Sequence, residues 1–373
     1  MTPRQLKTLA LVTLLVAAAA AVAVYGRGPG KGAGDTASGL LAPAFAGRLN
    51  AVSGLHIVTP DGQFSIARDA DGKTWRLAEK DGYRVPFGKV KKLLVGLARA
   101  SRLEPKTRKP ENYPKIGVGD PLKGADGDKK GGTLVEVRAG DEVLLSLLVG
   151  HRRAARGTAA ATSYVRLSGE KQAWLVDHIP AVGSRAVDWL DSQIMRIGRR
   201  RIRGAKVVPP KGPALDVSRA SADQYDFTVA NLPKGREMAS PSAANAFAGA
   251  ISNLSFEDVA KSSDDGDGPA WAAEYLTFDG LRLRLKIRKQ GDEFWLTGAA
   301  DYDPMRMIRP DGKAKAAVMP EAPEDGAAEA RALNRRLAGW AFRLPLYKGQ
   351  EMTRALADVL KKPPAKAADK KAP

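Results

Sequence analysis

The sequence predicts a mixed α+β protein. It would have an N-terminal transmembrane helix, two tandem related units of antiparallel-rich sheet plus helix, and a helical C-terminal segment. Three observations predict this: an uncharged apolar run near the N-terminus, two later stretches with one shared pattern, and an ordinary globular composition. Of the 373 residues, 44% are hydrophobic and 27% charged, which suffices for one large or two medium domains with real cores.

The apolar run is TLALVTLLVAAAAAVAV, residues 8–24. As a helix it rises roughly 25 Å, just enough for a thin bilayer. Arg4 and Lys7 favour a cytoplasmic N-terminus, although Arg27 and Lys31 weaken the asymmetry. Ala21-Val22-Ala23 also fits the small-x-small pattern of signal cleavage. We expect residues 1–25 to be a single-pass anchor in a bacterial inner membrane with the body in the periplasm; a cleaved signal segment is the second choice.

Residues 26–49 follow as a flexible linker that begins with GRGPGKGAGDTASG. A phosphate-binding loop would need Ser or Thr after its Gly-Lys, and Lys31 is followed by Gly32.

Two stretches, from Gly54 and from Gly204, share one pattern. Each starts with an apolar strand (55–58 or 205–208) and turns at Pro-Asp-Gly (60–62) or Pro-Lys-Gly (210–212). Apolar residues then alternate with polar ones, and a third strand carries Trp75 or Phe227. Arg68 and Arg219 hold matching positions.

A helix follows in each stretch. Pro86 starts the first, with an apolar stripe at Val90, Leu93, Leu94 and Leu97. Ser240-Pro241 starts the second, with a stripe at Ala244, Phe247, Ile251 and Leu254. Further strands are predicted at 133–137, 143–149, 163–167 and 173–176, then at 274–278, 281–287 and 294–296, and Asp279-Gly280 predicts a hairpin.

These patterns set the predicted boundaries. The first α+β unit covers residues 50–195, with a helical stretch around 187–194, and the second covers 196–305. Residues 306–360 form the C-terminal helical segment, with helices expected at 327–337 and 352–360. Residues 361–373 are a disordered, basic, proline-containing tail.

Several local sequences resemble domain-of-unknown-function family 4340: the hairpin ending in Trp75, ENYPKIGVGDP (111–121), YVRLSGEKQAWLV (164–176), the helix start at 188–191 and GWAFRLPLYKGQEM (339–352). The resemblance covers roughly residues 50–360. It implies a membrane-anchored envelope protein, and some members are encoded beside ABC-type transport systems related to gliding-motility components. It carries over no functional residues.

Composition limits the chemistry. The chain has no cysteine and three histidines, His56, His151 and His178, so thiolate chemistry is excluded and histidine-rich metal sites are not expected. Two acidic loops, 126–128 and 264–268, lack the ligand spacing of an EF-hand. We find no motif for a catalytic, cofactor or metal site, and expect the protein not to be an enzyme.

The net charge of +19 favours anionic partners. The densest basic run provides candidate polyanion contacts: Arg196, Arg199, Arg200, Arg201, Arg203 and Lys206. If this run is a strand, alternate cations face solvent as an ordinary solvated face.

Three functions stay open. The first is a membrane-tethered periplasmic interaction or accessory module with a protein partner in the envelope. An ABC-type transporter complex is a candidate for that partner. The second is a basic binding module for anionic envelope polymers or lipid head groups, and nucleic acid is not expected. The third, a hydrolase of envelope polymers, requires a deep pocket with converging carboxylates.

Overall fold

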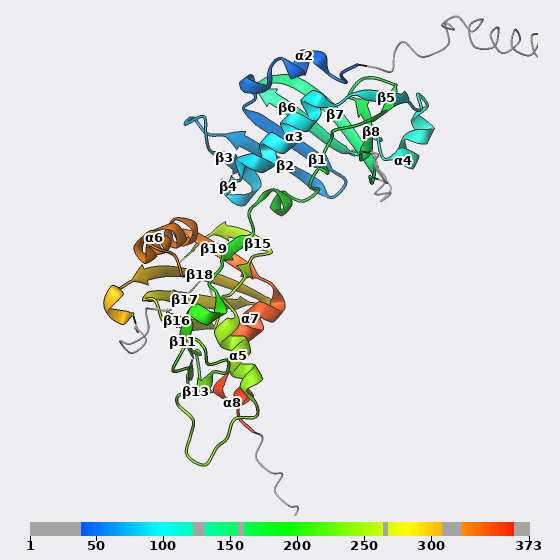
Figure 1. The fold of residues 1–373 in the computed structure, drawn as a ribbon. Helices are drawn as coiled ribbons and strands as arrows, with labels where there is room; N and C mark the ends of the chain where they lie inside the picture. The colour runs from blue at the N-terminus through cyan, green and yellow to red at the C-terminus, as the bar shows by residue number, and fades with distance from the viewer. Residues whose placement is uncertain (1–38, 122–130, 156–159, 264–267, 308–321, 362–373) are drawn as a thin grey trace, which may run out of the picture. The chain divides into compact units, whose positions relative to one another are not determined.

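Two large sheets make up most of the computed structural model, which describes residues 39–121, 131–155, 160–263, 268–307 and 322–361 (Figure 1). Every strand pair whose register is described within them is antiparallel. The predicted mixed α+β class is thus confirmed. The chain divides into two compact units, residues 1–51, 92–135 and 143–182 in one and 52–91, 136–142 and 183–373 in the other. That boundary runs through the first sheet, so each sheet is described by itself.

The first sheet has nine strands in the order β4-β3-β2-β1-β6-β7-β8-β9-β5. The strands are β1 (Gly54–Thr59), β2 (Gly62–Arg68), β3 (Trp75–Leu77), β4 (Tyr83–Val85), β5 (Arg102–Pro105), β6 (Thr133–Ala139), β7 (Glu142–Arg153), β8 (Thr162–Leu167) and β9 (Ala173–Val176).

The predicted first hairpin and helix are both present. Thr59 pairs with Gly62, so Pro60 and Asp61 form the turn between β1 and β2. Helix α3 (Phe87–Arg99) begins directly after Pro86. All four residues of its predicted stripe are buried, at 6% exposure or less. Burial of this apolar stripe, more than helix propensity, holds the helix in place.

The segment before β1 is more structured than a linker. Helix α2 (Pro43–Ala46) lies within residues assigned to the linker, and Leu41 and Phe45 are 1% exposed. Leu40 also forms an antiparallel bridge with Ser101. These apolar side chains are buried, so residues assigned to the linker belong to the folded part of the chain.

The second sheet has eight strands in the order β13-β12-β11-β16-β17-β18-β19-β15. They are β11 (Ile202–Val208), β12 (Leu215–Ser218), β13 (Thr228–Val229), β15 (Asp258–Lys261), β16 (Ala270–Thr277), β17 (Leu281–Gln290), β18 (Glu293–Tyr302) and β19 (Trp340–Leu344). Its order matches the first sheet strand for strand once β4 is left out. In both, the first strand of the sheet that comes after the helix in sequence (β5 or β15) lies at the far edge.

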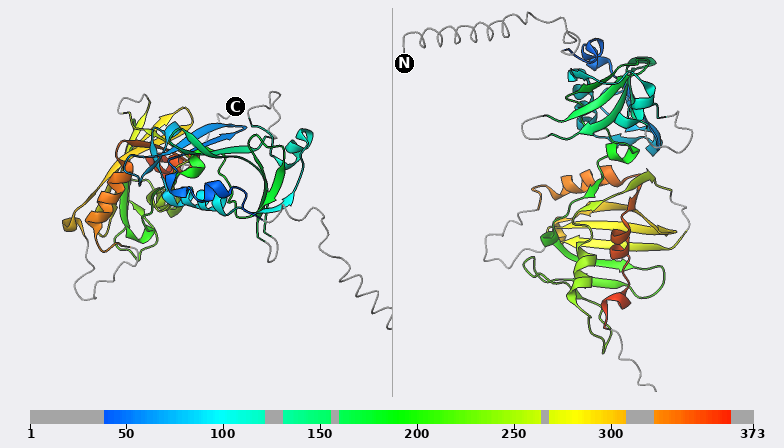
Figure 2. Two further views of the ribbon diagram at one scale, coloured as in Figure 1. Left: turned by 90° about the horizontal axis from the view of Figure 1, so that it is seen from above. Right: turned by 90° about the vertical axis from the view of Figure 1, so that its right-hand side faces the viewer.

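One face of the second sheet is the core side. Leu281, Leu283, Leu285 and Ile287 alternate along β17 at 3% exposure or less. Helix α5 (Pro241–Gly249) packs on this face: the Tyr275 hydroxyl of β16 donates to the Phe247 carbonyl at 3.2 Å. Helices α7 (Leu346–Met352) and α8 (Leu356–Val359) contact α5, and Figure 2 (right) shows the long strands β16–β18 side by side in yellow.

Three local predictions differ from the structure. Helix α5 ends at Gly249, and Leu254 instead begins β14 (Leu254–Ser255), which pairs with β10 (Gln193–Met195). The stretch 187–194 is a 3-10 turn, η4 (Ala186–Trp189), followed by β10. The helix does not continue because the backbone from Gln193 onward pairs with β14. The predicted C-terminal helices include α6 (Gly326–Leu337), but residues 340–344 form β19 inside the sheet.

The predicted hairpin at Asp279-Gly280 is present with a longer turn than expected. Residues 278–280 connect β16 to β17, and Gly280 has a φ of +92°. Thr277 replaces the missing backbone pair: its hydroxyl accepts from the Leu281 amide at 2.9 Å and donates to the Leu281 carbonyl at 3.2 Å.

Among the described residues, no helix has the length and apolar character needed to cross a membrane. The predicted anchor at residues 8–24 lies outside the described residues, and so does the predicted basic tail, 361–373, beyond its first residue.

Candidate functional site: the polar face of the second sheet

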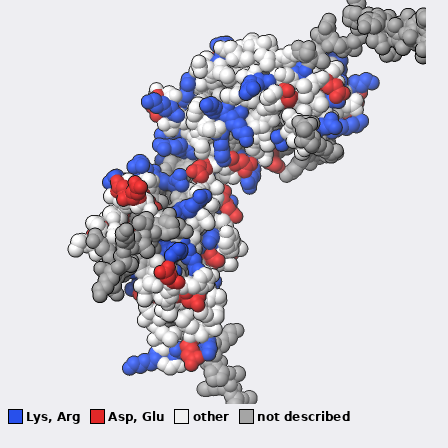
Figure 3. Space-filling model, in the orientation of Figure 1, with Lys and Arg blue, Asp and Glu red and all other residues white. Residues whose placement is uncertain are grey.

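The face of the second sheet opposite the helices is polar and rich in cations. Along β17, Arg282, Arg284, Lys286 and Arg288 alternate with the buried leucines and isoleucine. A strand places successive side chains on opposite faces, so all four cations point away from the core. Figure 3 shows Lys and Arg side chains spread over the visible surface with acidic residues between them.

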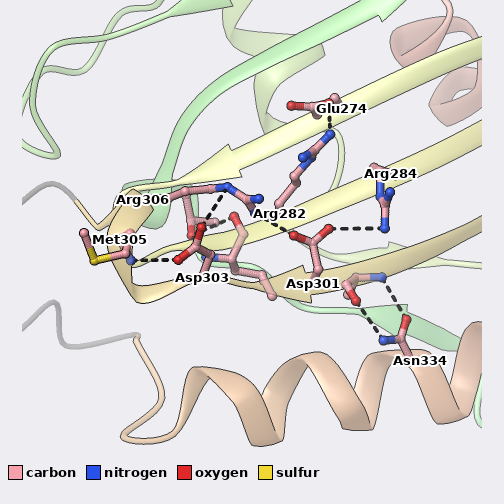
Figure 4. A network of polar contacts seen from close by, with 11 residues as sticks. Glu274, Arg282, Arg284, Asp301, Asp303, Met305, Arg306 and Asn334 are labelled. Carbon is pink, nitrogen blue, oxygen red and sulfur yellow. Dashed lines mark hydrogen bonds and ion pairs between the residues drawn. The ribbon is translucent and has the colours of Figure 1, made fainter.

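Carboxylates neutralise one end of this face (Figure 4). Arg282 pairs with Glu274 at 3.1 Å and Arg284 with Asp301 at 3.4 Å. Arg306 pairs with Asp301 at 2.5 Å, and this contact raises the pKa of Arg306 above its usual value. The side chains in these pairs are mostly about a third exposed, and each charge has a partner of opposite sign, so this end offers little net charge to a ligand.

The start of the predicted basic run is also largely occupied. Arg199 stacks on Tyr225 at 4.1 Å and donates to the Tyr225 carbonyl at 2.8 Å. Arg200 pairs with Asp223 at 2.6 Å. Arg196 is exposed. Of these three, only Arg196 has no described partner.

Arg201 is buried. Its side chain is 2% exposed and binds two carboxylates, Asp279 at 2.7 Å and Glu329 at 2.6 Å. Burial acts to lower the pKa of Arg201, but the hydrogen bonds that Arg201 donates to Glu329 and Asp279 outweigh it and the pKa is raised. This arginine joins the β16–β17 turn to α6 and is not available to a polyanion at the surface.

The last two predicted contacts, Arg203 and Lys206, lie together on the polar face. They line a hollow of about 410 Å³ between β11, β12 and β16. Lys206 is in register with Asp216 on one side and Glu274 on the other. Its charge is therefore flanked by two carboxylates, and the hollow has a mixed rather than a basic lining.

A second hollow on the same face has no acidic lining residue; we call it the basic groove. It holds about 200 Å³ and is lined by Lys261, Ser262, Lys286, Arg288, Trp295 and Thr297, among others. Lys261 lies over the Trp340 ring at 4.0 Å. The sequence analysis missed this groove. The available signal was the alternation in LRLRLKIRKQ, which puts cations on one face of a strand. The aspartates at 264, 265 and 267 that follow in the chain lie outside the described residues.

A third hollow, larger than these two, lies on the first sheet; we call it the tyrosine groove. It holds about 670 Å³ and is lined by Tyr113, Pro114, Leu134, Leu148, Arg166 and Ser168, among others. Arg166 stacks on Tyr113 at 4.5 Å and donates to the carbonyls of Val118 and Glu170 at 3.2 and 3.0 Å. Asp120, Glu170 and Lys171 also line it.

The histidines lie apart. His56 Nδ1 is 3.1 Å from the Ser65 hydroxyl, and His151 is exposed at the end of β7. His178 has a φ of 59° in the turn after β9, with Nδ1 2.7 Å from Asp177. No group of three or more His, Cys, Asp or Glu side chains in the described ranges could hold a metal ion. The acidic loop 126–128 lies outside those ranges.

Comparison with known proteins gives one family. A family model described as a domain of unknown function, DUF4340, matches residues 75–275, which is more than half of the chain. No curated protein and no solved structure shows significant similarity to the chain.

Proposed function

Because the chain belongs to the DUF4340 family, whose description assigns no activity, we propose its function from the surface that it presents. The protein is a membrane-tethered periplasmic interaction module without catalytic activity. It holds an acidic protein partner of the cell envelope on the polar face of its second sheet. An ABC-type transport system is the partner class that the family resemblance implies.

The basic groove carries the proposal. Lys261, Lys286 and Arg288 meet there from two strands, and no lining residue is acidic. Lys286 is exposed and has no described partner. A groove whose lining includes cations and no carboxylate steers an acidic surface toward it and fixes its register, which is what a docking site requires.

The tether follows from the N-terminal sequence. The uncharged run 8–24, with Arg4 and Lys7 before it, supports an inner-membrane anchor that leaves the sheets in the periplasm. The equal order of the two sheets supports a further part of the proposal, that they are related units produced by duplication. Arg68 lies over the Trp75 ring at 6.0 Å and Arg219 over the Phe227 ring at 4.7 Å. The two matched arginines therefore both contact the aromatic residue of the third strand pattern in their own unit.

Affinity capture with full-length, detergent-solubilised protein tests the proposal. The bait is compared with a Lys286→Gln/Arg288→Gln variant and with a Lys211→Gln/Lys234→Gln control, which removes the same charge from exposed positions outside the groove. We expect one set of envelope proteins to be captured by wild type and control and lost with the groove variant. Capture that is equal for all three, or that yields no specific membrane protein, contradicts the proposal.

A second function is favoured by the same absence of acidic lining residues: binding of anionic envelope polymers or lipid head groups. Such binding is electrostatic, so the affinity should fall steeply above an ionic strength of about 0.1–0.15 M, where the Debye length is about 8–10 Å. Co-sedimentation with vesicles containing phosphatidylglycerol, repeated over a salt series, measures it. Binding that does not change with salt, or no binding at low salt, removes this candidate.

A further inference from the structure

The incoming chain is fixed to one edge of the first sheet. β5 is the last strand in the order of that sheet, and residues 39–41 run antiparallel beside its start. The Leu41 amide donates to the Ala100 carbonyl at 2.7 Å, and the Arg102 amide donates to the Gly39 carbonyl at 3.0 Å. The Arg102 guanidinium also donates to the Leu41 carbonyl at 3.2 Å. The incoming chain and β5 belong to the same compact unit, so this edge is part of one body.

Apolar side chains are exposed along this edge. Leu40 is 41% exposed and Leu103 is 45% exposed. Leu40 forms its bridge with Ser101, so Leu103 is its diagonal neighbour across the two strands. Pro105, at the end of β5, is also exposed. Because proline has no amide hydrogen to donate to a further strand, these exposed residues are better suited to an apolar surface than to extension of the sheet.

The chain in and around β5 is strongly basic. Residues 99–115 contain six Lys or Arg and two Glu, which gives a net charge of +4. Glu104 pairs with Lys106 at 2.5 Å, and the other acid, Glu111, is exposed. Asp177 also approaches the start of β5, where it accepts a backbone hydrogen bond at 2.9 Å. Three of the cations are exposed and have no described partner for their side chains: Arg99, Arg108 and Lys109.

We propose that this edge docks on an anionic phospholipid bilayer. The edge surface consists of five exposed residues: Leu40, Arg99, Leu103, Arg108 and Lys109. Basic side chains are attracted to an anionic membrane within about a Debye length of it, and exposed apolar side chains enter the boundary between head groups and acyl chains. Cations and leucines on one edge therefore match both layers of a bilayer surface.

The occupant is the bilayer that holds the anchor itself. Residues 25–38 separate the apolar run from Gly39, and 14 residues reach at most about 50 Å. Gly39 is also the point at which the chain joins the edge surface. The tether thus keeps this edge close to lipid, which turns weak contacts into an intramolecular event.

The inference rests on the membrane anchor of the proposed function and adds a second contact with the same membrane. It differs from the lipid form of the second function, because that form uses the basic groove of the other sheet. The edge surface orients the first sheet on the bilayer and makes no use of the groove.

Fluorescence quenching on the full-length protein in liposomes tests the inference. The chain has no cysteine, so Leu103→Cys carries a single bimane probe on the edge surface, and Lys211→Cys carries one on the second sheet as the control. The liposomes contain phosphatidylcholine, phosphatidylglycerol and a lipid with a nitroxide in its head group as quencher. We expect strong quenching of the probe at position 103 and weak quenching at position 211. Retention of the protein after an alkaline carbonate wash, measured on the same samples, reports separately on the anchor.

Charge variants in the Leu103→Cys background test the electrostatic part. Arg108→Gln/Lys109→Gln should lower the ratio of docked to undocked protein about 25-fold, at roughly fivefold for each cation near an anionic surface. Lys211→Gln/Lys234→Gln removes the same charge from exposed positions on the second sheet and should leave the quenching unchanged. Liposomes of phosphatidylcholine alone should also reduce the quenching at position 103.

Two results overturn the inference and leave the anchor standing: retention in the liposomes with equal quenching at positions 103 and 211, or quenching at position 103 that Arg108→Gln/Lys109→Gln does not change. Quenching that is lost with Lys286→Gln/Arg288→Gln instead also overturns it, in favour of lipid binding at the basic groove. Loss of the protein in the carbonate wash contradicts the anchor of the proposed function, and the inference that rests on it fails as well.

Discussion

Replacing Arg201 by methionine should strongly destabilise the eight-stranded sheet. The guanidinium is 2% exposed and makes four hydrogen bonds, of 3.1 and 2.7 Å to Asp279 and of 2.8 and 2.6 Å to Glu329. Its loss leaves two carboxylates, 14% and 18% exposed, facing each other without a counter-charge. Removing one partner of a buried ion pair costs about 3–5 kcal/mol. Because the carboxylates keep some exposure, we expect about 3–4 kcal/mol.

The assay is urea and thermal unfolding of Arg201→Met beside wild type, with hydrogen exchange in β11 and α6 to locate the loss. For a body of this size the cost corresponds to a Tm lower by roughly 6–16 °C. The control is Arg200→Met, which deletes the neighbouring arginine from a pair whose members are 55% and 85% exposed. It should change stability by less than about 1 kcal/mol.

A triple variant, Arg201→Met/Asp279→Asn/Glu329→Gln, separates two effects: the loss of the ion-pair attraction, and the cost of leaving the two carboxylates without a counter-charge. It should be more stable than Arg201→Met alone, because the uncompensated carboxylates are gone. The reasoning fails if Arg201→Met unfolds within about 1 kcal/mol of wild type. It also fails if the triple variant is no more stable than the single one.

Three further outcomes are expected. Asn334→Ala should lower the free energy of unfolding by about 1–3 kcal/mol and speed hydrogen exchange at Ala300. The Asn334 carboxamide accepts from the Ala300 amide at 2.8 Å and donates to the Ala300 carbonyl at 2.7 Å (Figure 4). Unchanged exchange at Ala300 would contradict this expectation. Burial raises the pKa of the Tyr275 hydroxyl, so the free energy of unfolding should be highest below the unfolded-state pKa near 10 and fall as the pH rises above it. In denaturant titrations, Tyr275→Phe should make this fall at alkaline pH smaller. Backbone hydrogen bonds from Thr74 and Lys73 lower the pKa of Asp71 to about 2. The contribution of Asp71 to stability is therefore fully present above about pH 3.8 and is lost as the pH falls through 2. An NMR titration midpoint near 3.8 for the Asp71 carboxyl would refute this.

Local pattern predicted the elements whose partners are close in sequence. The β1–β2 hairpin, α3 with its stripe and the β16–β17 hairpin all formed where alternation, proline and glycine indicated them. The short strands at distant edges were missed. β15 pairs with β19 across about 80 residues, and β10 pairs with β14 across about 60, so neither strand has a local partner that would mark it.

The candidate site followed the same division. The basic run at 196–206 was visible as composition, but its meaning depended on partners far along the chain. Asp279 and Glu329 take Arg201 into the interior, and Asp223 pairs with Arg200. The cations that line the basic groove, Lys261 and Lys286, are separated in sequence and meet only because β15 and β17 belong to one sheet.

The sequence by itself determined the class of this protein: an apolar N-terminal run, two stretches of strands and helix with one pattern, and a basic excess. These depend on the periodicity of neighbouring residues, which a linear sequence displays directly. Only the tertiary structure decided that the two sheets share one strand order, that β19 belongs to the second sheet, and which carboxylates pair with Arg200 and Arg201. Edge strands and charged side chains pair with residues that lie close in space but far away in the sequence, so a local sequence pattern does not reveal the partner.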